Sequence, residues 1–384
     1  MTGGGSGGHI TPILAVAAEV KRLQPDTRII YIGQKGDHFS EIPAQNKHID
    51  NVYVVRAGKF RRYHGAGWKQ IFDVITIAKN CRDAFFVVAG FAQSLRLLRK
   101  LKPDLVFVKG GFVGVPVGLA AAVRHIPYVT HDSDAIPGLA NRIIARWARM
   151  HTVAMPEETY VYPRAKTVMV GVPIDSSYQP VTPQLMRQYR EQLNLTAFNK
   201  ILLVTGGGLG AQRINESVLA IIGPLLEAVP DLAIVHTVGS THEKKMRKAY
   251  DALLSPDKRG RVVVKGFVTD LYRYSGAADV VVARAGATNL AELAVQGKPS
   301  IIIPNPFLTG GHQLKNAELL ARQQAIVLVH EHEMQNGALL KSVTDILNNP
   351  AKQTELSAHI AAFARPDAAQ RLAMVLLEQA AQKS

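Results

Sequence analysis

The sequence predicts an α/β protein with two domains of the nucleotide-binding type. Strand-like apolar runs alternate with helical segments along the chain, a pattern typical of parallel α/β domains. Two similar glycine-rich runs, at residues 2–7 and 205–210, each lead into a predicted helix. Glycines let the backbone of such a turn approach a ligand closely, and the free N–H groups at a helix start suit a phosphate. The doubled turn therefore predicts one phosphate-binding turn in each domain.

Length and composition are those of a globular protein. The chain has 384 residues, enough for two ordinary domains, and 47% of them are hydrophobic. Cys81 is the single cysteine, so no intramolecular disulfide can form. The chain begins with glycines instead of an apolar signal segment, and no uncharged apolar stretch reaches the ~18–20 residues of a membrane helix. We therefore expect a cytoplasmic protein without a signal peptide.

Positive charge is concentrated in the first half of the chain. The net charge is +15, and residues 1–170 hold 23 Lys and Arg against 12 Asp and Glu. This asymmetry favours an anionic partner for the first half, such as nucleic acid, acidic lipid or phosphate. A contribution to solubility alone is the other interpretation.

The predicted elements alternate regularly in both halves. In the first half we expect strands at 28–32, 51–55, 105–108, 128–131 and 151–154, and helices at 13–23 and 94–101. In the second half we expect strands at 201–204, 233–237, 261–265, 280–283, 300–303 and 325–329, and helices at 212–226, 244–254, 289–295 and 314–322. Thr11 and Pro12 are predicted to be the N-cap and the first residue of the first helix. A Pro-bearing stretch at 163–180 is the expected boundary between the halves.

Polar and glycine-rich motifs follow several predicted strands. The run Gly110-Gly111-Phe112-Val113-Gly114 comes after strand 105–108, at the end of the sheet where α/β proteins bind ligands. The other motifs, in chain order, are His9, His131-Asp132-Ser133-Asp134, Gly207-Gly208-Leu209-Gly210, Arg284-Ala285-Gly286-Ala287 with Glu292, and His312-Gln313. A histidine at a glycine-rich helix entrance can act as a base or bind phosphate, although a surface histidine has the same signature.

Taken in this order, the motifs resemble the MurG family of glycosyltransferases (glycosyltransferase family 28, GT-B superfamily) over residues 1 to about 330. Members of this family transfer N-acetylglucosamine from UDP-N-acetylglucosamine to lipid I, forming the peptidoglycan precursor lipid II. The resemblance implies the GT-B architecture, with two Rossmann-like domains facing across a cleft. It implies an acceptor domain at 1–163, a UDP-sugar domain at 164–365, and a C-terminal helix within 366–384 that returns to the first domain.

The resemblance assigns the donor, UDP-N-acetylglucosamine, to the second domain. The expected donor-binding residues are Asp134, Gly207, Gly208, Gly210, Val268, Ala287, Thr288, Glu292, His312 and Gln313. The glycines would hold the diphosphate, Glu292 would accept the ribose hydroxyls, and the backbone of Val268 would recognise uracil. Outside this motif, Glu292 would be interpreted as an exposed helix glutamate.

The first domain is expected to bind lipid I. Its pyrophosphate would contact Gly5, Ser6, Gly7, Gly8, Gly110, Gly111 and Gly114. His9 is the first candidate and His131 the second for the base that deprotonates the acceptor 4-hydroxyl. The family inverts configuration by direct displacement, so we expect no covalent intermediate and no cofactor. The Asp132-Ser133-Asp134 triplet also fits Mg²⁺ or Mn²⁺, but we favour a site without a metal.

A basic and apolar segment follows the second predicted strand and resembles the family's membrane-facing segment. Its candidate membrane residues are Lys59, Arg61, Arg62, Trp68, Phe72 and Ile75. Apolar anchors beside basic residues suit anionic lipid, at about 1 kcal/mol per basic residue near the surface. We expect a peripheral protein on the cytoplasmic face of the membrane; a core helix with a solvated basic loop is the alternative.

Several positions depart from the family pattern. His131-Asp132-Ser133-Asp134 stands where the family has His-Glu-Gln-Asn, and Gly208 replaces a frequent serine. Asp175 stands where an arginine is usual, so a cation near the diphosphate is missing unless Arg213 or Arg284 substitutes for it. Only Met1-Thr2 precede the first glycine turn, where the family has a strand. We therefore expect the natural protein to begin several residues earlier.

These observations predict an inverting N-acetylglucosaminyltransferase that acts on lipid I. The enzymatic alternatives are another GT-B glycolipid glycosyltransferase and a UDP-N-acetylglucosamine 2-epimerase. A nucleotide-sugar sensor without turnover and a basic nucleic-acid-binding protein are the non-enzymatic alternatives. We expect no nucleic-acid partner, because no recognised nucleic-acid-binding motif accompanies the charge.

Overall fold

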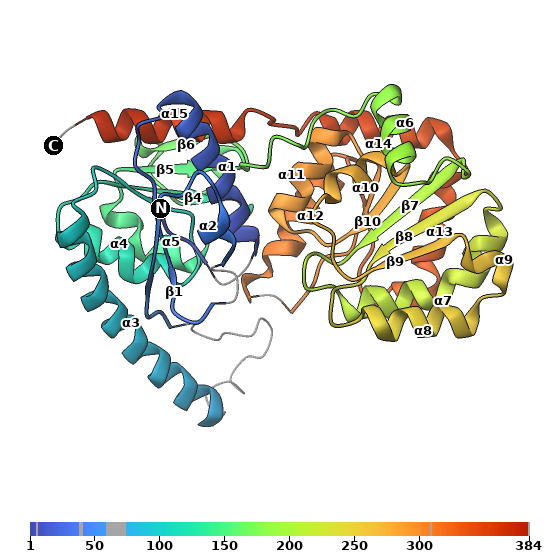
Figure 1. Cartoon of the computed structure of the whole chain (residues 1–384), viewed down its shortest axis with the longest axis horizontal. Helices are drawn as coiled ribbons and strands as arrows, with labels where there is room; N and C mark the ends of the chain where they lie inside the picture. Colours follow the sequence, from blue (N-terminus) through green and yellow to red (C-terminus); the bar gives the residue numbers. More distant parts are fainter. Residues whose placement is uncertain (5–6, 38–40, 59–73, 308, 383–384) are drawn as a thin grey trace. The chain divides into compact units, whose positions relative to one another are not determined.

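The computed structural model describes residues 1–384 except 5–6, 38–40, 59–73, 308 and 383–384. Its contacts divide the chain into two units. Unit 1 consists of Met1–Ser176, Phe307–His312 and Arg365–Ser384, and unit 2 of Ser177–Pro306 and Gln313–Ala364. Each unit contains parallel strands flanked by helices (Figure 1). The two-domain α/β fold expected from the sequence is confirmed.

Unit 2 has a six-stranded parallel sheet in the order β9-β8-β7-β10-β11-β12. The strands are β7 (Lys200–Thr205), β8 (Leu232–Thr237), β9 (Val262–Lys265), β10 (Val280–Ala283), β11 (Ser300–Ile302) and β12 (Val327–Leu328). Numbered from β7 as the first strand, this order is 3-2-1-4-5-6, that of the Rossmann fold. Strands β8 and β10 are buried along their whole length, as expected when helices cover both faces of a sheet.

The helices of unit 2 form two apolar cores, one on each face of the sheet. Their bounds are α6 (Pro183–Gln192), α7 (Gln212–Ala228), α8 (Glu243–Leu253), α9 (Pro256–Arg259), α10 (Leu271–Ala277), α11 (Ala287–Gln296), α12 (His312–Arg322), α13 (Ala338–Leu347) and α14 (Pro350–Ala361). Ile214 and Ile222 of α7 pack with α8 and α13 in one core. Leu290 and Leu293 of α11 pack with α12 and α14 in the other.

The sheet of unit 1 has the same order with one further strand at its end, β2-β1-(Met1-Thr2)-β3-β4-β5-β6, once Met1 and Thr2 are included. Its strands are β1 (Ile30–Gln34), β2 (Asn51–Val55), β3 (Val106–Val108), β4 (Tyr128–Asp132), β5 (Met150–Val153) and β6 (Thr167–Met169). Thr2 bridges β1 and β3 in parallel: its N–H donates to Phe107 O at 2.8 Å, and Ile32 N–H donates to Met1 O at 2.9 Å. These two residues therefore occupy the position of the first strand.

The helices of unit 1 are α1 (Gly7–Leu23), α2 (Glu41–Gln45), α3 (Val74–Leu101), α4 (Gly114–Val123), α5 (Leu139–Ile144) and α15 (Ala368–Ala381). Leu372 and Leu376 of α15 share a buried core with Ile13 and Val16 of α1. Figure 1 shows α15 beside α1 although they lie at opposite ends of the chain. The C-terminal helix thus returns to the first unit, as predicted.

The beginning of α1 was predicted incorrectly. The helix starts at Gly7, so Thr11 and Pro12 lie inside it and are neither its N-cap nor its first residue. Pro12 suggested the first helical residue, because a proline further inside a helix lacks the N–H donor of a regular hydrogen bond. The glycines before it carry no Cβ atom and therefore did not mark the true start. Strand β6 was missed because its three residues are too short for a clear pattern.

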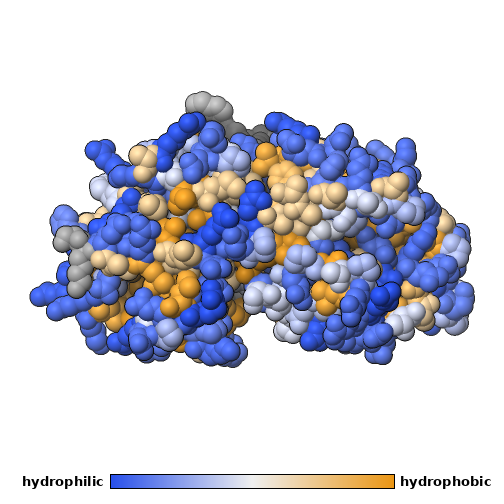
Figure 2. All heavy atoms as spheres, turned by 90° about the horizontal axis from the view of Figure 1, so that it is seen from above, coloured by the Kyte–Doolittle hydropathy of each residue, from blue (hydrophilic) through white to orange (hydrophobic). Residues whose placement is uncertain are grey.

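Among the helices as described, none combines the length and the apolar character needed to cross a bilayer. Figure 2 shows one face of the molecule, where hydrophilic residues predominate and apolar residues (orange) lie between them in several areas. Most large apolar residues are instead buried beside the sheets.

Candidate active site

The candidate sites lie where the strand order of each sheet reverses. This point is between β7 and β10 in unit 2, and between Thr2 and β3 in unit 1. Open α/β sheets bind ligands at such points, beyond the carboxyl ends of the strands. A helix starts after each of these four strand positions: α7 and α11 in unit 2, and α1 and α4 in unit 1. Each site therefore has two helix starts whose N–H groups can face an anion.

The two glycine turns of unit 1 pack against each other. Gly110 and Gly111 have φ values of +106° and +78°. A Cβ atom on Gly111 would lie 2.5 Å from the carbonyl oxygen of Gly4, so this backbone contact requires glycine. Of the other predicted acceptor residues, Gly7 and Gly8 lie in the first turn of α1, Gly114 begins α4, and Gly5 and Ser6 are outside the described residues.

His9 lies in the first turn of α1 and is half-buried. Burial lowers the pKa of its imidazole to about 4, the charge of Lys109 adds to this effect, and Asp134 opposes it. Its Nδ1 is buried and forms no hydrogen bond within the described part of the chain. At pH 7 the ring is therefore neutral, which is the protonation state that a general base needs.

His131 is fully buried at the end of β4. Its ring nitrogens pair with Thr152 Oγ1 and Ser133 Oγ, each at 3.1 Å. Burial, with a smaller contribution from Lys109, holds the pKa of His131 well below its usual range. Because both nitrogens are engaged inside the protein, this ring is suited to fix the end of the strand and less suited than His9 to accept a substrate proton.

Asp132 is also used within the protein. Its Oδ1 accepts a hydrogen bond from Gly138 N–H at 2.9 Å, and its Oδ2 accepts one from the Tyr162 hydroxyl at 2.7 Å. Burial raises the pKa of Asp132, although these hydrogen bonds oppose the shift. Within the described ranges, no three His, Cys, Asp or Glu side chains come together in a way that could hold a metal ion.

Lys109 is a site residue that the sequence analysis missed. It follows β3 directly, is 3% exposed, and its N–H donates to Thr2 O at 2.9 Å. Burial lowers the pKa of Lys109, while the charges of Asp134 and Asp132 raise it. The signal was a lysine at the end of an apolar strand, directly before Gly110. The structure thus adds a buried cationic side chain to the glycine turns.

Asp134 and His312, both expected to bind the donor, lie close together in unit 1. The Nδ1 of His312 is 3.6 Å from Oδ2 of Asp134. Gln313 belongs to unit 2, where its Oε1 accepts a hydrogen bond from Asn305 N–H at 2.9 Å. The structure therefore divides these three predicted donor residues between the two units.

The glycine turn of unit 2 has an inner and an outer side. Gly207 and Gly210 have φ values of +84° and +77°, and Gly210 N–H donates to Gly207 O at 2.9 Å. A Cβ on Gly210 would lie 2.0 Å from the carbonyl oxygen of Val238, whereas a Cβ on Gly207 would have no neighbour within 4 Å. Gly210 thus fixes the turn against the chain after β8, while Gly207 faces open space.

The second helix start of unit 2 is fixed by two asparagines. Asn316 Nδ2 donates to Ala285 O at 3.1 Å, and Asn289 Nδ2 donates to Arg284 O at 3.0 Å. These bonds hold the turn before α11, which begins with the predicted residues Ala287 and Thr288. The N-cap residue Gly286 provides no side-chain cap, so the N–H groups of the first helical turn are left for a ligand.

Two further predicted donor residues lie near this turn. Glu292 is half-buried on α11 and lines a small cavity with Thr205 and Asn289. Val268 is half-buried just after β9 and follows the exposed Phe267. Phe267 lies 3.6 Å from where a Cβ of Gly208 would stand. The structure therefore brings Glu292 to the end of β7, and Phe267, the neighbour of Val268, to the glycine turn at Gly208.

A buried carboxylate connects the two motifs of unit 2. Glu331 Oε2 lies 2.6 Å from Arg213 Nη1, and Glu331 Oε1 lies 2.6 Å from Arg284 Nη2. The Arg284 side chain is only 11% exposed and is committed to Glu331, so it is not available as the replacement cation considered above. Arg213 is also paired with Glu331, but at 56% exposed it is the more accessible of the two arginines. Sequence reasoning missed Glu331 because nothing in its surroundings marks it.

Almost all of the predicted membrane residues lie outside the part of the chain that the structure describes. Lys59, Arg61, Arg62, Trp68 and Phe72 lie outside the described residues, and Ile75 belongs to α3.

Comparisons with known proteins agree with this arrangement. Models of the N-terminal and C-terminal domains of glycosyltransferase family 28 match residues 1–152 and 201–372. A protein of Halalkalibacterium halodurans is 31% identical over 99% of both chains, and one of Desulforudis audaxviator is 32% identical over 96% of this chain and 94% of its own. Both are named UDP-N-acetylglucosamine–N-acetylmuramyl-(pentapeptide) pyrophosphoryl-undecaprenol N-acetylglucosamine transferase.

Solved structures show the same fold. Acinetobacter baumannii MurG has a TM-score of 0.70 at 23% identity, covering 98% of each chain. A Listeria monocytogenes protein described as a UDP-N-acetylglucosamine 2-epimerase has a TM-score of 0.66 at 11% identity, covering 100% of this chain and 96% of its own. Since both folds are similar, the sequence identity to the transferases decides the family. The chain belongs to the MurG family of N-acetylglucosamine transferases, glycosyltransferase family 28.

Proposed function

We propose that the chain transfers N-acetylglucosamine from UDP-N-acetylglucosamine to N-acetylmuramyl-(pentapeptide) pyrophosphoryl-undecaprenol, lipid I, and thereby forms lipid II. The observation that carries the proposal is the presence of a glycine turn and two helix starts at the switch point of each unit. Donor and acceptor each contain a diphosphate, so a transferase needs two such sites. Relatives named for this reaction are 31–32% identical, whereas two structural neighbours named as 2-epimerases are 11% and 15% identical.

In unit 2, the donor diphosphate would lie on the outer side of the turn at Gly207 and Gly208. The first N–H groups of α11, at Ala287 and Thr288, would face the same phosphates. Glu292 would accept hydrogen bonds from the ribose. As the bond between the anomeric carbon and UDP breaks, negative charge grows on the diphosphate, and fixed N–H dipoles stabilise it without reorganisation.

In unit 1, the acceptor diphosphate would lie at the turns around Gly4 and Gly111, beside the buried Lys109. The acceptor 4-hydroxyl oxygen would attack the anomeric carbon while His9 takes the hydroxyl proton. A base with a pKa of about 4 is weak at neutral pH. A bound anionic diphosphate raises the pKa of a neighbouring imidazole, so binding of the acceptor would itself make His9 a better base.

The acceptor carries a lipid, so we also propose that unit 1 associates with the cytoplasmic face of the membrane as a peripheral protein. The support is the composition of residues 59–75, which combines basic and large apolar side chains.

The experiment that tests the transferase proposal uses purified protein, radiolabelled UDP-N-acetylglucosamine and a short-chain lipid I analogue. We expect label in the lipid product only when both substrates are present. Conversion of the donor without an acceptor would indicate an epimerase, and donor binding without turnover would indicate a sensor. Lys109→Met should raise the KM for the acceptor with little change in the KM for the donor, because Lys109 lies in the acceptor unit.

A further inference from the structure

A separate cavity of unit 1 plays no part in the proposed reaction. It has a volume of about 370 Å³ and lies between α5, the 3₁₀ turn Ala145–Trp147 that follows it, and the chain around β5 and β6. The residues that line it are Arg142, Ala145, Arg146, His151, Val161, Tyr162, Pro163 and Lys166. None of these residues belongs to a glycine turn, so the cavity is distinct from the site of unit 1 described above.

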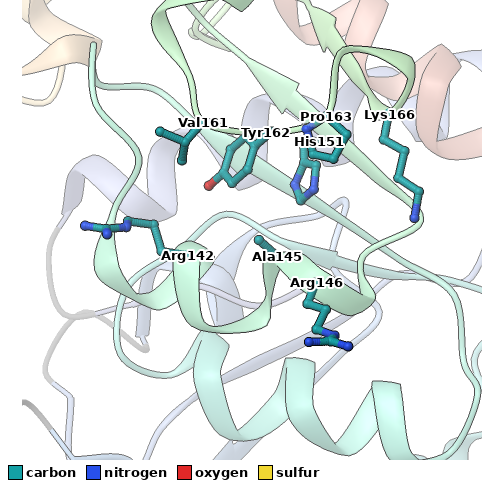
Figure 3. A pocket seen from close by; sticks show the side chains of 8 residues that line it. All are labelled: Arg142, Ala145, Arg146, His151, Val161, Tyr162, Pro163 and Lys166. Carbon is teal, nitrogen blue, oxygen red and sulfur yellow. The ribbon is translucent and has the colours of Figure 1, made fainter.

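The cavity has a strong excess of positive charge. Figure 3 shows three cationic side chains around it, with Arg142 to the left, Arg146 below and Lys166 to the right. No acidic residue lines the cavity. Across the described portion of the sequence, no carboxylate lies within 4 Å of these three cations, whereas the nearby Arg164 has Glu158 at 3.9 Å.

The floor of the cavity is formed by two stacked rings. His151 is 1% exposed, and its ring stacks on Tyr162 with centroids 4.0 Å apart and planes inclined by 10°. Its Nδ1 pairs with Thr130 Oγ1 at 2.7 Å, and the Tyr162 hydroxyl donates to Asp132. Burial and the charge of Lys166 lower the pKa of His151 to about 4, so the ring itself is uncharged at pH 7. The cavity therefore combines an aromatic surface with cationic side chains around it.

We propose that this cavity binds a phosphate ester, with the phosphate between Arg146 and Lys166, which lie on the same side of the cavity in Figure 3, and the organic part against His151 and Tyr162. Guanidinium groups bind phosphate oxygens through paired hydrogen bonds, and one guanidinium with one ammonium matches the charge of a phosphate better than that of a single carboxylate. The exposed Val161, at 78%, offers the organic part an apolar contact on the open side. The ligand is either the headgroup of a phospholipid or a soluble phosphate ester.

The test measures glycerol 1-phosphate binding by calorimetry, with UDP present at a saturating concentration to occupy unit 2. Substituting Arg146→Gln or Lys166→Gln should weaken binding about tenfold each, because each removes one charge-assisted contact. Arg164→Gln is the matched control: it removes a charge two residues from Lys166 but does not line the cavity, so affinity should stay unchanged. The ring signals of His151 in NMR spectra should shift on binding and report the location.

A second arm distinguishes the two sources of the phosphate. Nanodiscs of phosphatidylglycerol, with phosphatidylcholine nanodiscs as reference, are compared with the soluble ester on the same variants. Loss of the phosphatidylglycerol preference in Arg146→Gln and Lys166→Gln assigns the cavity to a lipid headgroup; loss of glycerol phosphate binding alone assigns it to a soluble ester. Failure of the unmodified protein to bind either probe, or equal binding by the double variant while its circular dichroism is unchanged, would overturn the proposal.

Discussion

The glycine turn of unit 2 permits a matched comparison between Gly210→Ala and Gly207→Ala. Both positions have a positive φ, +77° and +84°, so a side chain costs about 1–2 kcal/mol of backbone strain at either. At Gly210 the new methyl group would also stand 2.0 Å from the carbonyl oxygen of Val238. Relieving that overlap requires a backbone shift, which costs about another 1–3 kcal/mol. We expect a total loss of ~2–5 kcal/mol for Gly210→Ala and ~1–2 kcal/mol for Gly207→Ala.

The two variants should also differ in their affinity for the donor, and here Gly207→Ala should show the larger loss. The methyl group of Gly207→Ala would project into the open space where the diphosphate is proposed to lie, so the Kd for UDP should rise about tenfold, or ~1.4 kcal/mol. Urea unfolding followed by intrinsic fluorescence measures the free energy of unfolding, and calorimetry measures the Kd for UDP. Equal unfolding free energies for the two variants would refute the steric argument. Unchanged UDP binding by Gly207→Ala would refute the placement of the diphosphate.

Three further predictions concern single residues. Glu292→Gln should raise the KM for UDP-N-acetylglucosamine about tenfold or more, because it removes the charged acceptor of the ribose hydrogen bonds. Glu355→Gln, on the exposed side of α14, should leave this KM unchanged. Equal KM values for the two variants in steady-state kinetics would contradict the prediction. If His9 is the base, kcat/KM should stay constant as the pH is lowered from neutrality and fall only near pH 4, where the imidazole gains a proton and can no longer act as a base. A profile that falls near pH 6.5, or a fully active His9→Gln variant, would speak against this assignment. Glu331→Ala should lower the free energy of unfolding by about 3 kcal/mol, because it leaves the 11%-exposed Arg284 without its carboxylate. Arg213→Gln should lower it by less than ~1 kcal/mol, because Arg213 is 56% exposed. Equal losses for the two variants in denaturant unfolding would contradict this ranking.

Strands were the most predictable part of the fold. The runs at 51–55 and 280–283 match β2 and β10 residue for residue. Both runs are short, rich in valine and bounded by polar or glycine residues, so their composition indicates a strand although only β10 is buried throughout. Helix starts were less predictable: Thr11 and Pro12 have the composition of a helix start but lie inside α1, which begins at Gly7 although glycine is intrinsically unfavourable in a helix.

The first strand shows where local pattern is insufficient. Met1 and Thr2 form too short a run to be predicted as a strand. In the structure they fill the central position through backbone hydrogen bonds to both β1 and β3. Those bonds depend on residues about 30 and 100 positions away, which no local pattern contains.

In the candidate site, the sequence predicted which turns would matter but not how the polar side chains would pair. The glycine turns were identifiable because positive φ and close backbone contacts restrict these positions to glycine. The engagement of both His131 nitrogens, and the sharing of Glu331 between Arg213 and Arg284, arise from tertiary packing. Buried charges such as Lys109 are placed by the fold, so their role becomes visible only when their neighbours are known.

The most direct test of the central claim is the identity of the product formed from UDP-N-acetylglucosamine and a lipid I analogue. A proton NMR time course with the purified full chain follows the anomeric signals of donor and product. Direct displacement predicts one UDP released for each new sugar linkage, and a β-linked product recognised by the large coupling constant of its anomeric proton. Appearance of UDP-N-acetylmannosamine, retention of the α configuration, or UDP release without a new linkage would contradict the account.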